Sequence, residues 1–174
     1  MAGRAPQRKL DEKSGHAPGR APAGRFAVVA ARFNEPISKK LADGAASALE
    51  AGGVASECVE VHWVPGSFEL PQAAMALART GRYAGIVCVG VVIRGETPHF
   101  EYVAGAAAHG LSRVGLETGV PVSFGVITSL TEAQAWERAG GAVGHRGEEA
   151  ARAALEMAAW IRGLKAGRAR PRRR

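Results

Sequence analysis

The stretch that decides the fold is "AGIVCVGVVI", residues 84–93, an unbroken run of apolar and small residues. A strand with one wet face alternates apolar and polar residues, whereas a strand covered on both faces is apolar throughout. Strands of the second kind belong to parallel sheets, because the helices that connect parallel strands cover both faces. The run therefore predicts a central parallel strand with helices on either side.

The segments around this run alternate between strand patterns and helix patterns. Three more strands are expected, at "FAVVAA" (26–31), "ECVEVHWV" (57–64) and "PVSFGVIT" (121–128). Helix patterns separate and follow the strands, at residues 36–53, 68–81, 98–119, 131–140 and 147–164. The order β-α-β-α-β-α-β-α-α with right-handed crossovers predicts an α/β fold, a three-layer α/β/α sandwich around a small four-stranded parallel sheet.

The two ends of the chain differ in composition from its middle. Residues 1–24 are rich in Ala, Gly, Pro and Arg, which predicts a disordered basic extension before a single domain at 25–164. Residues 165–174 carry six basic and no acidic residues and read as a basic tail. The net charge of +7 belongs to these ends, because 25–164 holds twelve basic and fourteen acidic residues. The domain is therefore not expected to bind specific nucleic acids, although the tail could bind polyanions weakly.

No segment is long and apolar enough to suggest a membrane span, and the N-terminus lacks the apolar core of a signal peptide. A transit peptide is disfavoured by Asp11 and Glu12. Cys58 and Cys88 lie in apolar, strand-like runs without a C-x-x-C spacing, so both are expected to be buried free thiols. These features predict a cytoplasmic protein that does not bind membranes.

The last expected helix is apolar on more than one side. One face is made by Ala150, Ala153, Ala154, Met157, Ala158 and Ile161, and other apolar residues, Leu155, Ala159 and Trp160, lie off that face. A helix of this kind must be covered on more than one side. In so small a domain the second cover is expected to come from another copy of the chain, which predicts a homo-oligomer.

Polar and aromatic residues gather after the expected strands, at the edge where ligands bind in open α/β sheets. The segments are "RFN" (32–34), "VPGSFE" (64–69) and "RGETPH" (94–99), and the fourth strand contains Phe124. These segments are the candidate site.

His99 is the first candidate for catalysis. Thr97 is a favourable N-cap and Pro98 suits the first helical position, which places His99 in the first turn. The free N–H groups and the helix dipole at that position attract an anion such as phosphate and disfavour a positive charge on imidazole. A neutral imidazole beside an anion site can take and give protons. The pattern by itself also fits an exposed histidine at a helix start.

Three further candidates have two interpretations each. Glu69 fits a surface glutamate at a helix start, or an acceptor for substrate hydroxyls. Phe33 fits a residue that closes the core, or a stacking surface for a flat ligand. Arg138 fits a solvated helix residue, or a phosphate ligand. The sequence shows no metal, nicotinamide or P-loop signature, so no cofactor is expected.

Five segments together resemble the lumazine synthase (6,7-dimethyl-8-ribityllumazine synthase) family, in order and in spacing. They are "ARFNEPISKKLADGA" (31–45), "VPGSFELPQAA" (64–74), "GVVIRGETPHFEYV" (90–103), "TGVPVSFGVIT" (118–128) and "ERAG" (137–140). The resemblance runs from about Phe26 to Arg162 and implies a flavodoxin-like fold. It also implies a transferase that condenses 5-amino-6-(D-ribitylamino)uracil with 3,4-dihydroxy-2-butanone 4-phosphate. The products are 6,7-dimethyl-8-ribityllumazine, phosphate and water, in the penultimate step of riboflavin biosynthesis.

The resemblance also implies roles for individual residues. Contacts to the pyrimidine and its ribityl chain would come from Phe33, Ser67, Phe68, Glu69, Val91, Val92 and Ile93. Phe33 would stack on the ring, and residues 91–93 would act partly through their backbone. Glu96 and Thr97 would meet the butanone phosphate, and His99 would be the acid/base residue. Phe124 and Arg138 would come from a neighbouring subunit, Arg138 toward the phosphate.

Two departures from the family concern assembly, which in the family is a pentamer or an icosahedral shell of sixty subunits. The segment "GGAVGHRG" (140–147) differs from the family, which often has lysine near Ala142 and asparagine at His145. The Pro- and Gly-rich residues before Gly24 are poor candidates for the N-terminal strand that pairs with a neighbour in the family. Two other functions stay open: a non-catalytic member that binds flavin or lumazine or builds a shell, and a polyanion-binding module that uses the tails.

Overall fold

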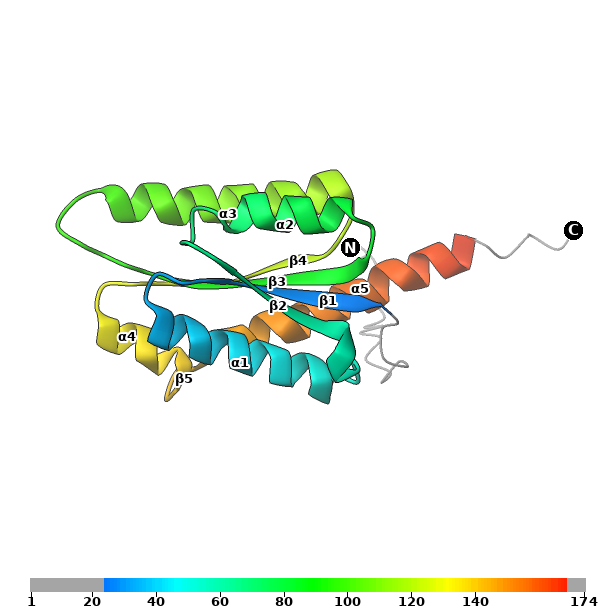
Figure 1. The fold of residues 1–174 in the computed structure, drawn as a ribbon, viewed down its shortest axis with the longest axis horizontal. Helices are drawn as coiled ribbons and strands as arrows, with labels where there is room; N and C mark the ends of the chain where they lie inside the picture. The colour runs from blue at the N-terminus through cyan, green and yellow to red at the C-terminus, as the bar shows by residue number, and fades with distance from the viewer. Residues whose placement is uncertain (1–23, 169–174) are drawn as a thin grey trace, which may run out of the picture.

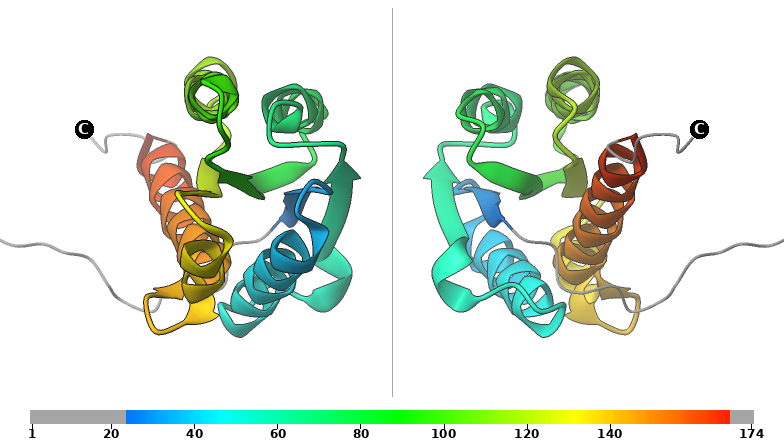
Figure 2. Two further views of the ribbon diagram at one scale, coloured as in Figure 1. Left: turned by 90° about the vertical axis from the view of Figure 1, so that its left-hand side faces the viewer. Right: turned by 90° about the vertical axis from the view of Figure 1, so that its right-hand side faces the viewer.

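The computed structural model describes residues 24–168. Its central sheet is parallel, with the strand order β2-β1-β3-β4. The strands are β1 (Arg25–Ala31), β2 (Val59–Val64), β3 (Tyr83–Ile93) and β4 (Val122–Ser129). The helices are α1 (Glu35–Ala51), α2 (Leu70–Arg79), α3 (His99–Thr118), α4 (Glu132–Glu137) and α5 (Arg146–Arg168). Helices α2 and α3 cover one face, and α1, α4 and α5 lie on the other (Figures 1 and 2), which confirms the predicted three-layer sandwich.

Strand β3 is the centre of the sheet, as its apolar run predicts. Its neighbours β1 and β4 pair with it on both sides, and nearly every residue along it is buried. Val28 and Val89 belong to the core cluster that includes α1 and α5. Val29 and Cys88 belong to the cluster that includes α2 and α3. The side chains of β3 are buried on both faces of the sheet, so the strand has no exposed position for a polar residue. This explains why the run is apolar throughout.

Local signals mark the end of α3 and the start of α4, but not the start of α3. Gly119 closes α3 in the left-handed conformation, with φ 69°. Thr131 caps α4, its hydroxyl accepting a hydrogen bond from the Gln134 N–H at 3.2 Å. The expected cap at Thr97 is wrong. Helix α3 begins at His99 with Pro98 as the flanking residue, and no side chain caps it.

Three features differ from expectation. Cys58 lies at the end of the 3-10 turn η1 (Ser56–Cys58) and is half-buried, so the prediction of a buried strand thiol is wrong there. Cys88 is a buried free thiol, as predicted, and its burial raises its pKa. Two short strands, β5 (Ala139–Gly141) and β6 (Gly144–His145), form a hairpin that the sequence did not predict. Helix α5 runs four residues past the expected end at Leu164.

The expected disordered extension, residues 1–24, lies almost wholly outside the described residues, as does most of the basic tail at 165–174. Within the described part of the chain, no helix combines the length and hydropathy that a membrane span requires. In the same part, no three His, Cys, Asp or Glu side chains cluster as metal ligands would.

Candidate active site

A pocket of about 640 Å³ opens at the carboxyl ends of the strands. Its walls come from the loops that follow β1, β2 and β3 and from the first turns of α3. These loops lie at the left of Figure 1, at the end of the sheet away from the C-terminus of α5. The pocket therefore occupies the edge where ligands bind in open α/β sheets.

Nine of the twelve residues that the sequence marks as candidates line this one pocket. They are Phe33, Ser67, Phe68, Glu69, Val91, Val92, Ile93, Thr97 and His99. The side chain of Val91 is buried in the core cluster with α1 and α5. Val91 therefore reaches the pocket through its main chain. Glu96 is exposed between two lining residues, Gly95 and Thr97, but does not line the pocket itself.

The loop after β1 presents Phe33 to the pocket. The ring is 71% exposed, so Phe33 does not close the core. Its backbone N–H donates to the carbonyl of Pro65 at 3.1 Å, which ties this loop to the one after β2. A rigid aromatic face at the rim of an apolar pocket is a surface on which a flat ring can stack.

The loop after β2 lies close against the sheet because residue 90 is a glycine. A Cβ added at Gly90 would lie 2.7 Å from the hydroxyl oxygen of Ser67 and 3.1 Å from Cβ of Ala31. Ser67 is consequently buried, while Phe68 beside it is 60% exposed and faces the opening. Glu69 follows as the half-buried residue at the start of α2, with its carboxylate available to hydroxyl donors.

His99 is the first residue of α3, a helix of 20 residues, and it is exposed. The N–H groups of a first helical turn have no partner in their own helix and carry the positive end of the dipole. Thr97 and Gly95 line the pocket just before this turn. The start of α3 therefore places an anion-binding position next to an imidazole that can transfer protons.

Phe124 and Arg138 lie elsewhere. Phe124 is 45% exposed on β4 and lines a second depression, the groove, which has a volume of about 600 Å³. Arg138 follows α4, where its guanidinium donates to the carbonyl of Gln134 at 2.9 Å. It lines neither the pocket nor the groove.

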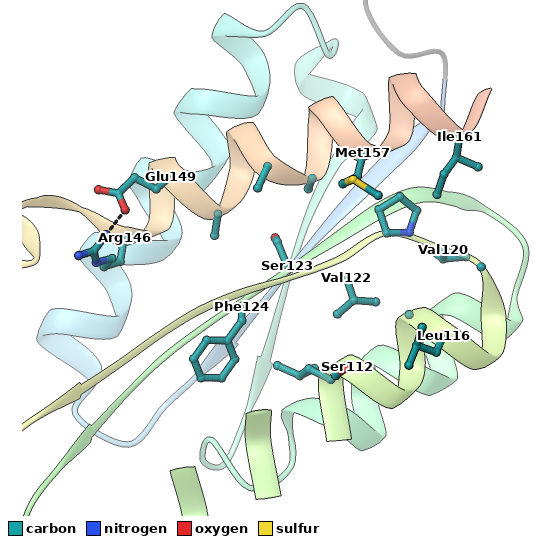
Figure 3. A pocket seen from close by; sticks show the side chains of 17 residues that line it. Ser112, Leu116, Val120, Val122, Ser123, Phe124, Arg146, Glu149, Met157 and Ile161 are labelled. Atoms are coloured by element: carbon teal, nitrogen blue, oxygen red, sulfur yellow. Dashed lines mark hydrogen bonds and ion pairs between the residues drawn. The ribbon is translucent and has the colours of Figure 1, made fainter. Parts of the chain in front are cut away.

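The groove follows β4 between α3 and α5 (Figure 3). Met157 and Ile161 of α5 form one wall, Leu116 of α3 forms the opposite wall, and Val122 and Phe124 lie between them. An ion pair between Arg146 and Glu149 stands at one end. The groove is thus an apolar strip beside an edge strand, with its charges confined to one end.

The pocket also contains residues that the sequence reasoning missed. Phe100 and Val103 line it and pack against the core cluster of α2 and α3, and Tyr102 stands 74% exposed at its rim. The spacing of Phe100 and Val103, three residues apart on one helix face, was a usable signal beside His99. Tyr102 had no such signal, because its place on the surface of the helix does not show that it borders the pocket.

Three exposed aromatic rings, a carboxylate, a main-chain strip on β3 and a histidine at a helix start thus surround one cavity. This set suits a flat heteroaromatic ring with a hydroxylated chain, next to an anionic second molecule. Residues 23–162 match the family model described as 6,7-dimethyl-8-ribityllumazine synthase.

Proposed function

The chain belongs to the 6,7-dimethyl-8-ribityllumazine synthase family, and from this premise we propose that its reaction takes place in the pocket lined by Phe33, Glu69 and His99. The family consists of transferases that condense 5-amino-6-(D-ribitylamino)uracil with 3,4-dihydroxy-2-butanone 4-phosphate. The product, 6,7-dimethyl-8-ribityllumazine, is formed in the penultimate step of riboflavin biosynthesis.

The observation that carries the proposal is the convergence of candidates in one cavity. Nine of them come from three segments, near residues 33, 67–69 and 91–99, and the fold brings these segments to one pocket. Residues from separate strand ends that meet around a cavity are the usual mark of a site in α/β folds.

The pyrimidine fits between Phe33 and the main chain of residues 91–93. Phe33 offers its exposed face for stacking, and the β3 backbone offers fixed hydrogen-bonding groups. Glu69 accepts hydrogen bonds from ribityl hydroxyls, and the buried Ser67 holds its loop against the sheet. Phe68 covers the other side of the opening.

The butanone phosphate fits the start of α3. The first-turn N–H groups bind the phosphate, with Glu96 and Thr97 beside it. Donors that hold phosphate in place also stabilise it as a leaving group.

His99 is positioned to move the protons of the condensation. The 5-amino group attacks the ketone, and loss of water gives an imine. Loss of the proton on C3 then expels phosphate from C4 and leaves an enol, which tautomerises to a ketone at C3. The ribitylamino nitrogen closes the ring on this new ketone with loss of another water. Each of these steps transfers a proton, and a histidine beside both substrates can serve them in turn. Binding both substrates in one pocket supplies the rest of the acceleration through positioning.

The site is completed, in this proposal, by a neighbouring subunit. Phe124 and Arg138 do not line the pocket of their own chain, and Phe124 stands in the apolar groove beside the edge strand β4. An exposed apolar groove of this kind fits a second copy of the chain. We therefore propose a homo-oligomer with sites between adjacent subunits, either a pentamer or a sixty-subunit shell of pentamers.

Two further predictions, on cellular location and on nucleic-acid binding, belong to this proposal. A cytoplasmic location is supported by the free thiols of Cys58 and Cys88, since a reducing compartment keeps such thiols unpaired. Specific nucleic-acid binding is not expected of the domain, whose basic and acidic residues nearly balance between positions 25 and 164.

The test is to mix the purified protein with both substrates and follow the fluorescence of the lumazine product. We expect product with the wild type, and a KM for the ribitylaminouracil raised roughly 10-fold or more in Glu69→Gln, because hydrogen bonds to a charged acceptor are lost. Glu50→Gln, which changes an exposed glutamate of α1, is the control. If Glu69→Gln has the same KM for the ribitylaminouracil as the wild type, the Glu69 carboxylate does not bind that substrate.

A further inference from the structure

Asn34 has an unusual backbone conformation and an unusual side-chain partner. Its φ of 59° makes it the one residue other than glycine with positive φ within residues 24–168. It precedes α1, yet its side chain does not cap that helix. Instead, its amide nitrogen Nδ2 donates to the carbonyl of Val91 on β3, at 3.2 Å. The side chain thus links the loop after β1 to strand β3.

The left-handed conformation frees the side chain for this contact. Asparagine adopts that conformation more readily than most other residues do. In this geometry the carbonyl of Asn34 accepts the N–H groups of Ile37 and Ser38, each at 3.1 Å, so the backbone itself starts α1. The amide is therefore not needed at the helix and can bind the sheet.

The contact extends the sheet beyond the end of β1. Pairing of β1 with β3 stops at Ala30 and Val89, and Val91 lies two residues further along β3. With no strand beyond Ala31, the carbonyl of Val91 is bound by the Asn34 amide. The main chain of Val91 is held in place at the point where it lines the pocket.

The backbone of Phe33 is held by hydrogen bonds on both sides, one to the loop after β2 and one to α1. On one side its N–H donates to Pro65, and on the other its carbonyl accepts the Ser38 hydroxyl at 3.2 Å. Asn34, the next residue, fastens the same loop to β3. Because the Phe33 ring is 71% exposed, side-chain packing does little to hold it, and the backbone bonds set its place.

We propose that Asn34 is a positioning residue for the reaction, which sets the separation between the Phe33 ring and the main chain of Val91 so that the pyrimidine fits between them. This inference rests on the proposed function, because it takes the pyrimidine to bind at those two groups. It predicts a selective kinetic defect. Loss of the link weakens binding of the ribitylaminouracil, while the butanone phosphate at the start of α3 is unaffected.

Two variants separate the hydrogen bond from the backbone conformation. Asn34→Gly keeps the left-handed conformation and removes the amide, and Asn34→Asp keeps the shape and replaces the donor with an acceptor. Thr80→Ala is the matched control, because it also removes a bond from a side chain to a carbonyl, that of Leu77 at 2.7 Å, at the far end of α2. KM for each substrate, kcat and Tm are measured for all three.

We expect KM for the ribitylaminouracil to rise roughly 3- to 10-fold in both Asn34 variants, the ratio that one hydrogen bond of ordinary net strength gives. KM for the butanone phosphate and the KM values of Thr80→Ala should stay close to wild type, even where Tm falls equally. Wild-type KM in Asn34→Gly, or equal rises for both substrates, would overturn the positioning role. Phe33→Ala separates the two claims. If it also leaves KM for the ribitylaminouracil unchanged, the proposed pyrimidine site fails; if it alone raises that KM, only the role of Asn34 fails.

Discussion

The pocket at the carboxyl ends of the strands and the groove beside β4 have nearly equal volumes, about 640 and about 600 Å³, and both have largely apolar walls. They differ in what else their walls carry. The pocket brings Glu69, Ser67 and His99 together with three exposed aromatic rings. The groove carries one ion pair at its end and two serines, Ser112 and Ser123, and its other lining residues are apolar or glycine.

The difference shows that size does not identify a site in this fold. The pocket lies where several strands end, so each loop contributes a different chemical group to one space. The groove lies along one strand and two helices, whose side chains repeat one kind of surface. The first arrangement suits a small molecule, and the second suits another protein surface.

The largest effect is expected from His99→Ala. Turnover should fall about 10²- to 10⁴-fold, the usual contribution of a general acid/base residue, while the circular dichroism spectrum stays that of the wild type. His109→Ala is the control, since His109 is also exposed on α3 but does not line the pocket. Equal turnover in His99→Ala and the wild type would assign the proton transfers to another group.

Ala153→Glu should break the assembly. Ala153 lines the groove, and a carboxylate forced into a dry contact between subunits costs on the order of several kcal/mol. We expect native mass spectrometry to show smaller species and activity to fall with them, because the proposed site needs two subunits. Ala76→Glu makes the same change at an exposed alanine of α2 outside the groove and should keep the assembly. Intact oligomers in Ala153→Glu would remove the groove from the subunit contact.

The smallest effect concerns a polar cluster outside both depressions. Glu60 on β2 accepts hydrogen bonds from the Tyr83 hydroxyl, from Arg25 at 2.9 Å and from Arg82 at 3.2 Å. The Tyr83 hydrogen bond is the main cause that lowers the pKa of Glu60, and both arginines add to it. A lowered pKa in the folded state means that the carboxylate stabilises the fold above the ordinary glutamate pKa of 4.5 and loses that effect as pH falls below it.

Glu60→Gln should therefore be less stable than the wild type at neutral pH, with the difference shrinking as pH falls below about 4. Urea unfolding at several pH values measures this, with Glu50→Gln as the control. Turnover should not change, because the cluster is remote from the pocket. A change in KM for either substrate would show that chemistry is not confined to the carboxyl edge.

Much of the fold and of the pocket follows from local patterns in the sequence. The unbroken apolar run of β3 is typical of a strand covered on both faces, and Gly119 had the left-handed conformation that ends a helix. The order of strands and helices then placed Phe33, Glu69 and His99 at one edge. These predictions succeed because each depends on a short stretch of chain and on one general rule of topology.

Three other features were not predictable in this way. The hairpin of β5 and β6 has strands too short to show alternation. The cap at Thr97 failed because α3 starts one residue later than expected, at His99, so that Pro98 takes the flanking position and Thr97 lies before it. The link from Asn34 to Val91 spans 57 residues and depends on a left-handed residue that no local pattern required.

The most direct test of a site shared between subunits is complementation between two variants that we expect to be impaired, His99→Ala and Arg138→Ala, co-expressed so that their subunits assemble at random. If each site combines the pocket of one subunit with Arg138 of the next, about a quarter of the mixed sites hold both wild-type residues. We expect activity near that fraction of the wild type, well above either variant alone. A mixture no more active than its two components would contradict a site shared between subunits.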